Sequence, residues 1–149
     1  MGNEEEIVYL VGKHLSIFNY EKRTHSFVLK GGNVQEIHCF AISHNRKFIA
    51  LSESVVPDSS KHAKKSPSPT KSLEEQSTVE YQVSVYNFKN AKRARVLNVI
   101  PSAGKPGPVI SMAFSRDAKY LAAVTDEPDQ SIYLWHLEKS NVCTNLIVS

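Results

Sequence analysis

The sequence predicts an all-β protein made of short antiparallel strands. Brief segments rich in β-branched and aromatic residues recur along the chain, and turn-forming residues separate them about every ten positions. No segment keeps the apolar spacing of an amphipathic helix over three turns. Pairs of segments also repeat one another, which is typical of folds assembled from similar structural units.

The expected strands are three to seven residues long, and Gly12 with Lys13 forms a tight turn between the first two. Gly31 and Gly32 form a further turn between strands. The predicted strands cover residues 7–11, 15–19, 27–29, 37–42, 48–51, 82–88, 95–100, 109–114, 120–124, 131–137 and 142–148.

Composition indicates a folded, soluble protein and excludes several classes. The 149 residues are one domain's worth, with 41% hydrophobic and 22% charged residues. The 18 basic residues are nearly balanced by 15 acidic ones, so no one-signed field favours nucleic acid. No apolar run is long enough for a membrane span, and the acidic residues 1–6 do not resemble a signal peptide. We therefore expect an intracellular, cytoplasmic protein that binds neither nucleic acid nor membrane.

The middle of the chain breaks the strand pattern. Residues 53–81 contain almost no large apolar side chains but many Ser, Lys, Glu and Pro residues, which predicts a flexible, low-complexity insertion. Ser66 and Ser68 each precede a proline and could accept phosphate from a proline-directed kinase. The alternative is a solvated insertion without a regulatory role.

Two internal repeats share one period once this insertion is removed. Residues 40–50 match 112–122 at an offset of 72, and residues 83–88 match 132–137 at an offset of 49. The difference of 23 residues falls between the matched segments of the first copy, where the insertion lies. Residues 15–20 follow the same pattern as 83–88: apolar, variable, aliphatic, aromatic, polar, apolar.

A unit of about 45–50 residues with four strands resembles the WD40 repeat, in which each repeat forms a blade of a β-propeller. Trp135 and His136 stand where that repeat has Trp-Asp, and Tyr86 and Phe18 are the degenerate counterparts of the tryptophan. The resemblance implies that Trp135 packs between neighbouring blades; the alternative is an exposed aromatic that takes part in recognition.

The hairpin between the first two strands of each repeat is its most specific part. It has Ser115 and Asp117 in one copy and Ser43 and Asn45 in the other. Asp and Asn side chains can hydrogen-bond nearby backbone, so both hairpins are predicted to make tight turns.

The repeats predict an incomplete ring of about two and a half to three WD40-like blades. Residues 7–29 form a partial blade without its first strand, 35–100 a full blade carrying the insertion, and 109–149 a further blade. The partial propeller thus covers 7–52 and 82–149. Because propellers usually have at least four blades, further blades or another chain are expected to complete it. Whether the tail from Asn141 is a native closing strand or an altered ending stays open.

The sequence assigns no catalytic, cofactor-binding or metal-binding residues, and we expect no enzyme and no cofactor. The six histidines are scattered, and Cys39 and Cys143 are far apart and are interpreted as small buried hydrophobes. Residues 104–107 are interpreted as a connection between blades, since their glycine spacing does not match a phosphate loop. The basic cluster of Lys92, Arg93 and Arg95 is either a solvated turn or a contact for an acidic partner.

Three segments carry a closer family resemblance. Residues 91–97, 110–121 and 133–139 are similar to the N-terminal propeller of the cilia- and flagella-associated WD-repeat proteins, and the similarity covers residues 7–142 outside the insertion. The resemblance implies a noncatalytic protein-interaction scaffold at the ciliary or flagellar axoneme, with cytoskeletal protein partners and a part in placing inner dynein arms for motility. Unlike those proteins, this chain has no coiled-coil heptads. The alternatives are an intracellular WD40 adaptor in a non-ciliary complex and a β domain with an enzymatic or ligand site assembled in space.

Overall fold

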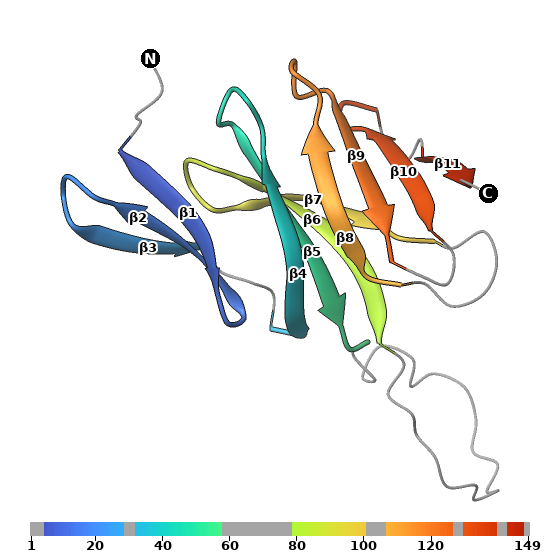
Figure 1. The fold of residues 1–149 in the computed structure, drawn as a ribbon, viewed down its shortest axis with the longest axis horizontal. Helices are drawn as coiled ribbons and strands as arrows, with labels where there is room; N and C mark the ends of the chain where they lie inside the picture. The colour runs from blue at the N-terminus through green and yellow to red at the C-terminus, as the bar shows by residue number, and fades with distance from the viewer. Residues whose placement is uncertain are drawn as a thin grey trace, which may run out of the picture.

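The computed structural model describes residues 5–28, 32–57, 79–100, 107–126, 130–139 and 143–147. Within these residues every regular element is a β-strand, and all strand pairs are antiparallel (Figure 1). The predicted all-β class is therefore confirmed.

The strands form three sheets in chain order. The first sheet has the order β1-β2-β3, the second β4-β5-β6-β7, and the third β11-β10-β9-β8. The strands are β1 (Glu6–Val11), β2 (His14–Asn19), β3 (Thr24–Val28), β4 (Val34–Ile42), β5 (Phe48–Val55), β6 (Glu80–Asn87), β7 (Arg93–Asn98), β8 (Val109–Phe114), β9 (Tyr120–Thr125), β10 (Ser131–His136) and β11 (Cys143–Ile147).

These sheets have the form of partial propeller blades. They lie side by side in Figure 1, with the second sheet between the other two. Each is a meander in which every strand pairs with the next one along the chain, and the described sheets do not close into a ring.

The strands of the second sheet extend into the predicted insertion at both ends. Glu53 to Val55 belong to β5, and Glu80 and Tyr81 belong to β6, so the predicted boundaries are wrong there. The two strands pair without a break from Phe48↔Asn87 to Val55↔Glu80. Polar residues such as Glu53 and Glu80 therefore belong to the sheet, although the composition of this segment predicts an insertion. The rest of the predicted insertion, Ser66 and Ser68 included, falls almost entirely within residues 58–78, which lie outside the described residues.

Two hydrophobic cores join the sheets. One holds Leu15 and Ile17 of the first sheet against Ile49, Leu51 and other residues of the second. The other joins the second sheet to the third, and its members are Ala50, Val83, Val85, Val99, Val109, Leu121, Ala123, Tyr133, Trp135 and Leu137. Trp135 is only 4% exposed in this second core, so its predicted position between two blades is confirmed.

Candidate protein-binding end of the sheets

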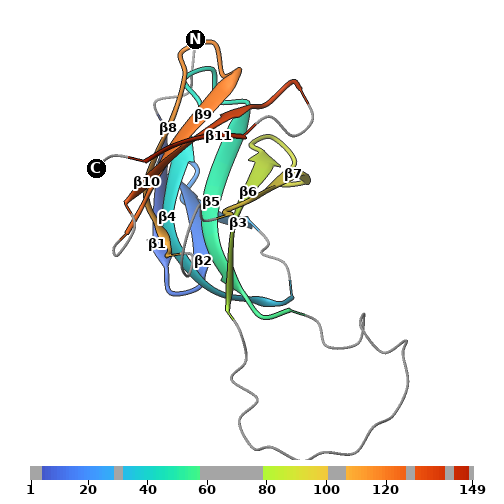
Figure 2. The same cartoon turned by 90° about the vertical axis from the view of Figure 1, so that its right-hand side faces the viewer.

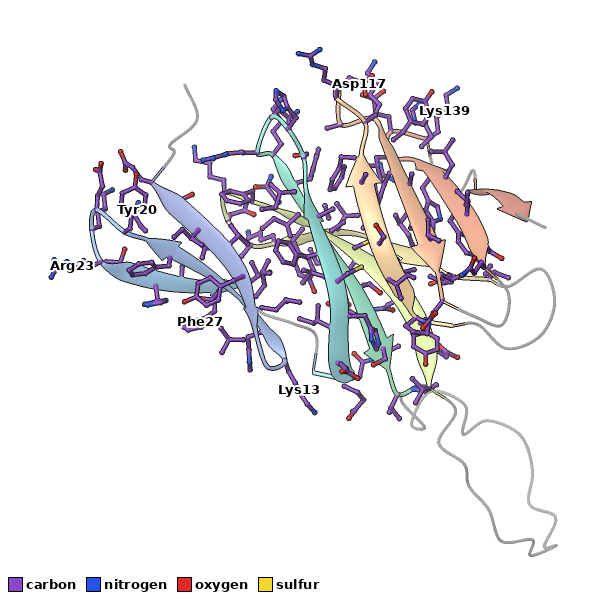
Figure 3. The ribbon with its side chains drawn as sticks, in the orientation of Figure 1. Lys13, Tyr20, Arg23, Phe27, Asp117 and Lys139 are labelled. Atoms are coloured by element: carbon purple, nitrogen blue, oxygen red, sulfur yellow. The ribbon has the colours of Figure 1, made fainter. Side chains whose placement is uncertain are left out.

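Four hairpins turn at the same end of the three sheets. Strand direction alternates along the chain, so the β2–β3, β4–β5, β6–β7 and β8–β9 turns all lie at this end (Figure 1). Figure 3 shows Asp117 and Lys139 there and Lys13 at the opposite end. We call this end, made of residues 20–23, 43–47, 88–92, 115–119 and 137–139, the hairpin end.

The β8–β9 turn is held by its own side chains. The Ser115 hydroxyl donates to Asp117 Oδ1 at 2.6 Å and accepts from the Tyr120 N–H at 2.9 Å. Asp117 Oδ1 also accepts from the Lys119 N–H at 3.1 Å. These bonds fix the turn without help from the rest of the fold, as predicted for Asp117.

The β4–β5 turn repeats this arrangement with an amide in place of the carboxylate. The Ser43 hydroxyl donates to Asn45 Oδ1 at 2.9 Å and accepts from the Phe48 N–H at 2.9 Å. Asn45 Oδ1 accepts from the Lys47 N–H at 3.1 Å. The predicted role of Asn45 in the turn is therefore also confirmed.

Each of the four turns contains one residue with a positive φ that is not glycine. The φ angles are 51° at Arg23, 51° at Arg46, 52° at Ala91 and 58° at Ala118. A side chain in this region costs roughly 1–2 kcal/mol, so the surrounding hydrogen bonds must hold these turns in shape. The hairpin end is thus a set of loops with defined geometry.

Exposed basic side chains gather at the hairpin end. In the described part of the chain, the opposite end has Lys13 but also the acidic Glu80 and Asp126. The described acidic residues at the hairpin end and its border number five, half as many as the basic ones: Glu5, Glu6, Glu21, Asp117 and Glu138. The basic residues at or beside it are Lys22, Arg23, Arg46, Lys47, Lys89, Lys92, Arg93, Arg116, Lys119 and Lys139, and all of these are exposed.

The predicted basic cluster is one part of this end. Lys92 lies in the β6–β7 turn, and Arg93 and Arg95 lie on β7, which begins two residues earlier than expected. The sequence cluster therefore identifies only one of the four basic hairpins. The other three hairpins are far from this cluster in sequence. They lie at the same end of the sheets because strand direction alternates along the chain.

Two grooves between the sheets lie near this basic surface. The smaller, of about 170 Å³, lies between the first and second sheets and is lined by Glu6, Val8, Ile42, Arg46 and Phe88. The larger, of about 590 Å³, lies between the second and third sheets and is lined by Phe48, Val85, Ala94, Arg95, Leu137 and Glu138. Each has an apolar wall and an arginine, so it could receive an apolar side chain flanked by an acidic one.

Protonation of Asp117 gives a first testable prediction. The Ser115 hydroxyl, and then the Lys119 N–H, stabilise the ionised carboxylate and lower the pKa of Asp117 below its usual value. A depressed pKa contributes stability above the unfolded-state value near 4, and this contribution is lost as the pH falls through the lower folded-state pKa. Thermal melts between pH 2 and 6 should therefore show a smaller acid-induced loss in Asp117→Asn than in the original chain.

The equivalent turn supplies the control for this prediction. Asn45→Ala removes the two hydrogen bonds that Asn45 Oδ1 accepts in the β4–β5 turn but no titrating group, so it should lower stability equally at every pH. Equal pH profiles for Asp117→Asn and the original chain would contradict the assigned role of the carboxylate.

A buried polar cluster lies between β5 and β6, where no local sequence pattern indicates one. Glu53 is fully buried, and its carboxylate accepts hydrogen bonds from Ser84 Oγ at 2.6 Å, Gln82 Nε2 at 3.0 Å and Tyr86 OH at 3.2 Å. Burial, and then the adjacent Glu53 carboxylate, raise the pKa of Tyr86 to about 12. Glu53, Ser84 and Tyr86 are all buried, so this cluster has a structural role at the boundary between the first two sheets.

Among the residues that the structure describes, several of the histidines considered for chemistry lie beside aromatic rings. His25 stacks on Phe18 at 4.5 Å, and His38 lies 5.8 Å from the ring of Tyr81. Among the described residues, no group of three or more His, Cys, Asp or Glu could hold a metal ion. Residues 104–106 of the Gly-Lys-Pro-Gly segment lie outside the described part.

Cys39 differs from its prediction as a buried hydrophobe. It is half-buried, and its Sγ donates to the Val109 carbonyl at 3.2 Å, which links the second sheet to the third. Burial raises the pKa of its thiol to about 11, so the thiol is protonated at neutral pH and is a poor nucleophile. The side chain of Cys143 lies outside the described residues.

Comparison by sequence shows a similarity to a protein of cilia and flagella. No family model matches the chain. It is 27% identical over 142 residues to cilia- and flagella-associated protein 57 of Mus musculus, a match that covers 94% of this chain and 9% of that protein. The chain therefore spans about a tenth of the length of this curated relative.

The described residues contain no helix with the length and apolarity to cross a membrane.

Solved structures match by fold. Segments of the tricorn protease (TM-score 0.58, 11% identity), Porphyromonas gingivalis dipeptidyl peptidase 4 (0.55, 15%) and an acylaminoacyl peptidase (0.55, 8%) are similar to 92%, 90% and 97% of this chain. The chain covers 11%, 23% and 23% of those proteins, and at such identities the likeness shows the fold alone. By sequence, the chain is related to cilia- and flagella-associated protein 57.

Proposed function

We propose that this protein is a noncatalytic scaffold of WD40 type that acts in the cilium or flagellum and binds an acidic segment of a protein partner at its hairpin end. The observation that carries this proposal is the set of exposed basic side chains on four turns of fixed geometry. The relationship to a cilia- and flagella-associated protein supports the ciliary location. Within the cilium, we propose the axoneme, with a part in placing inner dynein arms.

Fixed turns favour binding because little conformational entropy is lost when a partner docks. The Ser115–Asp117 and Ser43–Asn45 bonds already hold the backbone that carries Arg116, Lys119 and Lys47. Only the side chains then need ordering, which costs about 0.5–1.5 kcal/mol for each one immobilised. A surface of this kind gives an acidic partner a high association rate that falls with salt concentration.

A noncatalytic role is consistent with the groups on the described surface. The Cys39 thiol is protonated at neutral pH, and the buried Glu53 is enclosed by its three donors. The peptidases share only the fold, so their chemistry gives this chain no reaction. An adaptor in a non-ciliary complex would use the same surface and differ only in where its partner resides.

Reversing the charge of the hairpin end tests the proposal. In the variant Arg46→Glu, Lys47→Glu, Arg116→Glu, Lys119→Glu, we expect co-sedimentation with purified axonemes to fall about tenfold or more, because four attractive charges become repulsive. The original chain should also bind less tightly as salt rises from 50 to 300 mM.

Single reversals provide a matched control. Lys119→Glu should weaken axoneme binding, whereas Lys13→Glu, an identical change at the opposite end, should leave it unchanged. Equal binding by the fourfold variant and the original chain would contradict the assignment of this surface. Exclusion of the tagged protein from cilia, with intact binding to a cytoplasmic partner, would favour the non-ciliary adaptor.

A further inference from the structure

The first and third sheets each leave one apolar face uncovered. On the first sheet, Ile7 is 53% exposed and Phe27 is 52% exposed. On the third sheet, Leu134 is 39% exposed and Tyr120 is 40% exposed. These sheets lie at opposite ends of the array (Figure 1), and Figure 3 shows Tyr20 and Phe27 on the first sheet, far from Lys139 beside the third.

The uncovered face of the third sheet is the counterpart of a face that is packed within the chain. By the repeat offsets of 72 and 49, Tyr120 corresponds to Phe48 and Leu134 to Val85. Phe48 and Val85 belong to the core that joins the second sheet to the third. Val85 is only 2% exposed, so Leu134 differs from it chiefly in that none of the described sheets packs over it.

The uncovered face of the first sheet corresponds to the face of the third sheet that packs against the second sheet. Phe18 pairs with Ile7 across β1 and β2, just as Trp135 pairs with Leu121 across β10 and β9. Trp135 and Leu121 are buried against the second sheet. Ile7 and Phe18 therefore lie on the face of the first sheet that corresponds to the buried face of the third sheet.

Side-chain alternation supports this assignment of faces. In β2, Leu15 and Ile17 are in the core shared with the second sheet, so Phe18 lies on the other side of the strand. The Phe18 ring stacks on His25 at 4.5 Å, with Phe27 next to His25 at 6.4 Å. These rings form an aromatic surface that faces away from the second sheet.

We propose that two copies of this chain pack head to tail through these faces, so that Ile7 and Phe18 of one copy enter the uncovered face around Tyr120 and Leu134 of the other. Each contact repeats the packing seen between the second and third sheets of a single chain. The two contacts are identical and together close a ring of six sheets with two-fold symmetry, within the range of about four to eight blades that propellers use.

We favour a second copy as the partner for these faces because a single chain carries both of the complementary surfaces. The face around Leu134 and the face around Ile7 correspond, position by position, to surfaces already packed together in this structure. The hairpin end is not used in these contacts. Two copies would therefore present two basic hairpin ends on the same rim, because the two-fold axis that closes a ring runs along its centre.

Sedimentation of the full chain over a range of concentrations tests the proposal. We expect reversible association of the 16.7 kDa chain to twice that mass. Leu134→Glu and Ile7→Glu each place a charge on one uncovered face, and each should raise the dissociation constant about tenfold or more. Both side chains are exposed in the single chain, so circular dichroism should show that the variants keep their strands. Lys13→Glu, outside both faces, should dimerise like the original chain.

Mixing the two variants separates head-to-tail packing from other contacts. The Leu134→Glu copy keeps an intact first-sheet face and the Ile7→Glu copy an intact third-sheet face, so the mixture should recover dimer through one contact. Failure of mixing to restore any dimer would overturn the pairing of unlike faces. A monomer at every concentration, or growth into long open chains, would overturn the closed two-copy ring.

Discussion

Replacement of Glu53 by alanine is expected to lower the free energy of unfolding by about 3–5 kcal/mol, because it leaves buried hydrogen-bond donors unsatisfied and a cavity in place of the side chain. The carboxylate satisfies Ser84, Gln82 and Tyr86, and all three donors would lose this partner between the first and second sheets. The variant would also leave a cavity where a fully buried side chain stood. Urea denaturation followed by circular dichroism measures the change.

Conservative variants show whether hydrogen bonding or volume is responsible. Glu53→Gln keeps the side-chain volume and one carbonyl acceptor, so it should lose less stability than Glu53→Ala. Glu53→Leu fills the space without accepting hydrogen bonds and should remain well below the original chain. A loss of less than about 1 kcal/mol in Glu53→Ala would contradict the assigned role, since exposed substitutions usually fall within that range.

Trp135→Ala should cost a similar amount, about 3–5 kcal/mol, by emptying the core between the second and third sheets. The ring is 4% exposed and stacks on Tyr133 with centroids 5.5 Å apart and planes 12° apart. Trp135 is the one tryptophan of the sequence, so fluorescence of the original chain reports directly on this core. The variant is followed by circular dichroism in urea.

Trp135→Phe is the matched control, because it retains an aromatic ring that can still stack on Tyr133. It should lose less stability than Trp135→Ala. Tryptophan fluorescence of the folded original chain that resembles the unfolded spectrum would contradict burial of the ring between the sheets.

The sequence predicts features that depend on local pattern or on the internal repeat. The turn roles of Asp117 and Asn45 follow from residues two to five positions apart, and both are seen in the structure. The position of Trp135 was predicted from the resemblance of its repeat to a propeller blade, since equivalent positions in stacked repeats face equivalent neighbours. Both signals are contained in short stretches of chain.

The strand ends were predicted less well where polar side chains are involved. Thr24 and Arg93 begin the outer strands β3 and β7, whose side chains are largely exposed, so hydrophobicity gives no signal there. Glu53 is the opposite case, a charged residue that is fully buried. Its partners are 29 to 33 residues further along the chain, and only the fold brings them to it.

The candidate site was predicted only in part for a similar reason. The cluster around Lys92 is visible because its residues are consecutive, whereas Arg46, Arg116 and Arg23 are dispersed along the chain. They gather because each lies at a turn that follows an even-numbered strand, β2, β4 or β8. Two strands separate each of the four turns from the next, so all of them lie at the same end of the sheets. The strand order, rather than local sequence, therefore creates the basic surface.

The β5–β6 connection has a practical consequence for work in living cells. β5 ends at Val55 and β6 begins at Glu80, and both of these strand ends lie at the end of the second sheet opposite the hairpins (Figures 1 and 2). The 24 residues between them, 56–79, exceed what a simple hairpin requires. A fluorescent reporter inserted between these strands would leave both chain termini, the basic turns and the two uncovered sheet faces unaltered, so the protein could be imaged without altering the surfaces proposed to bind its partners.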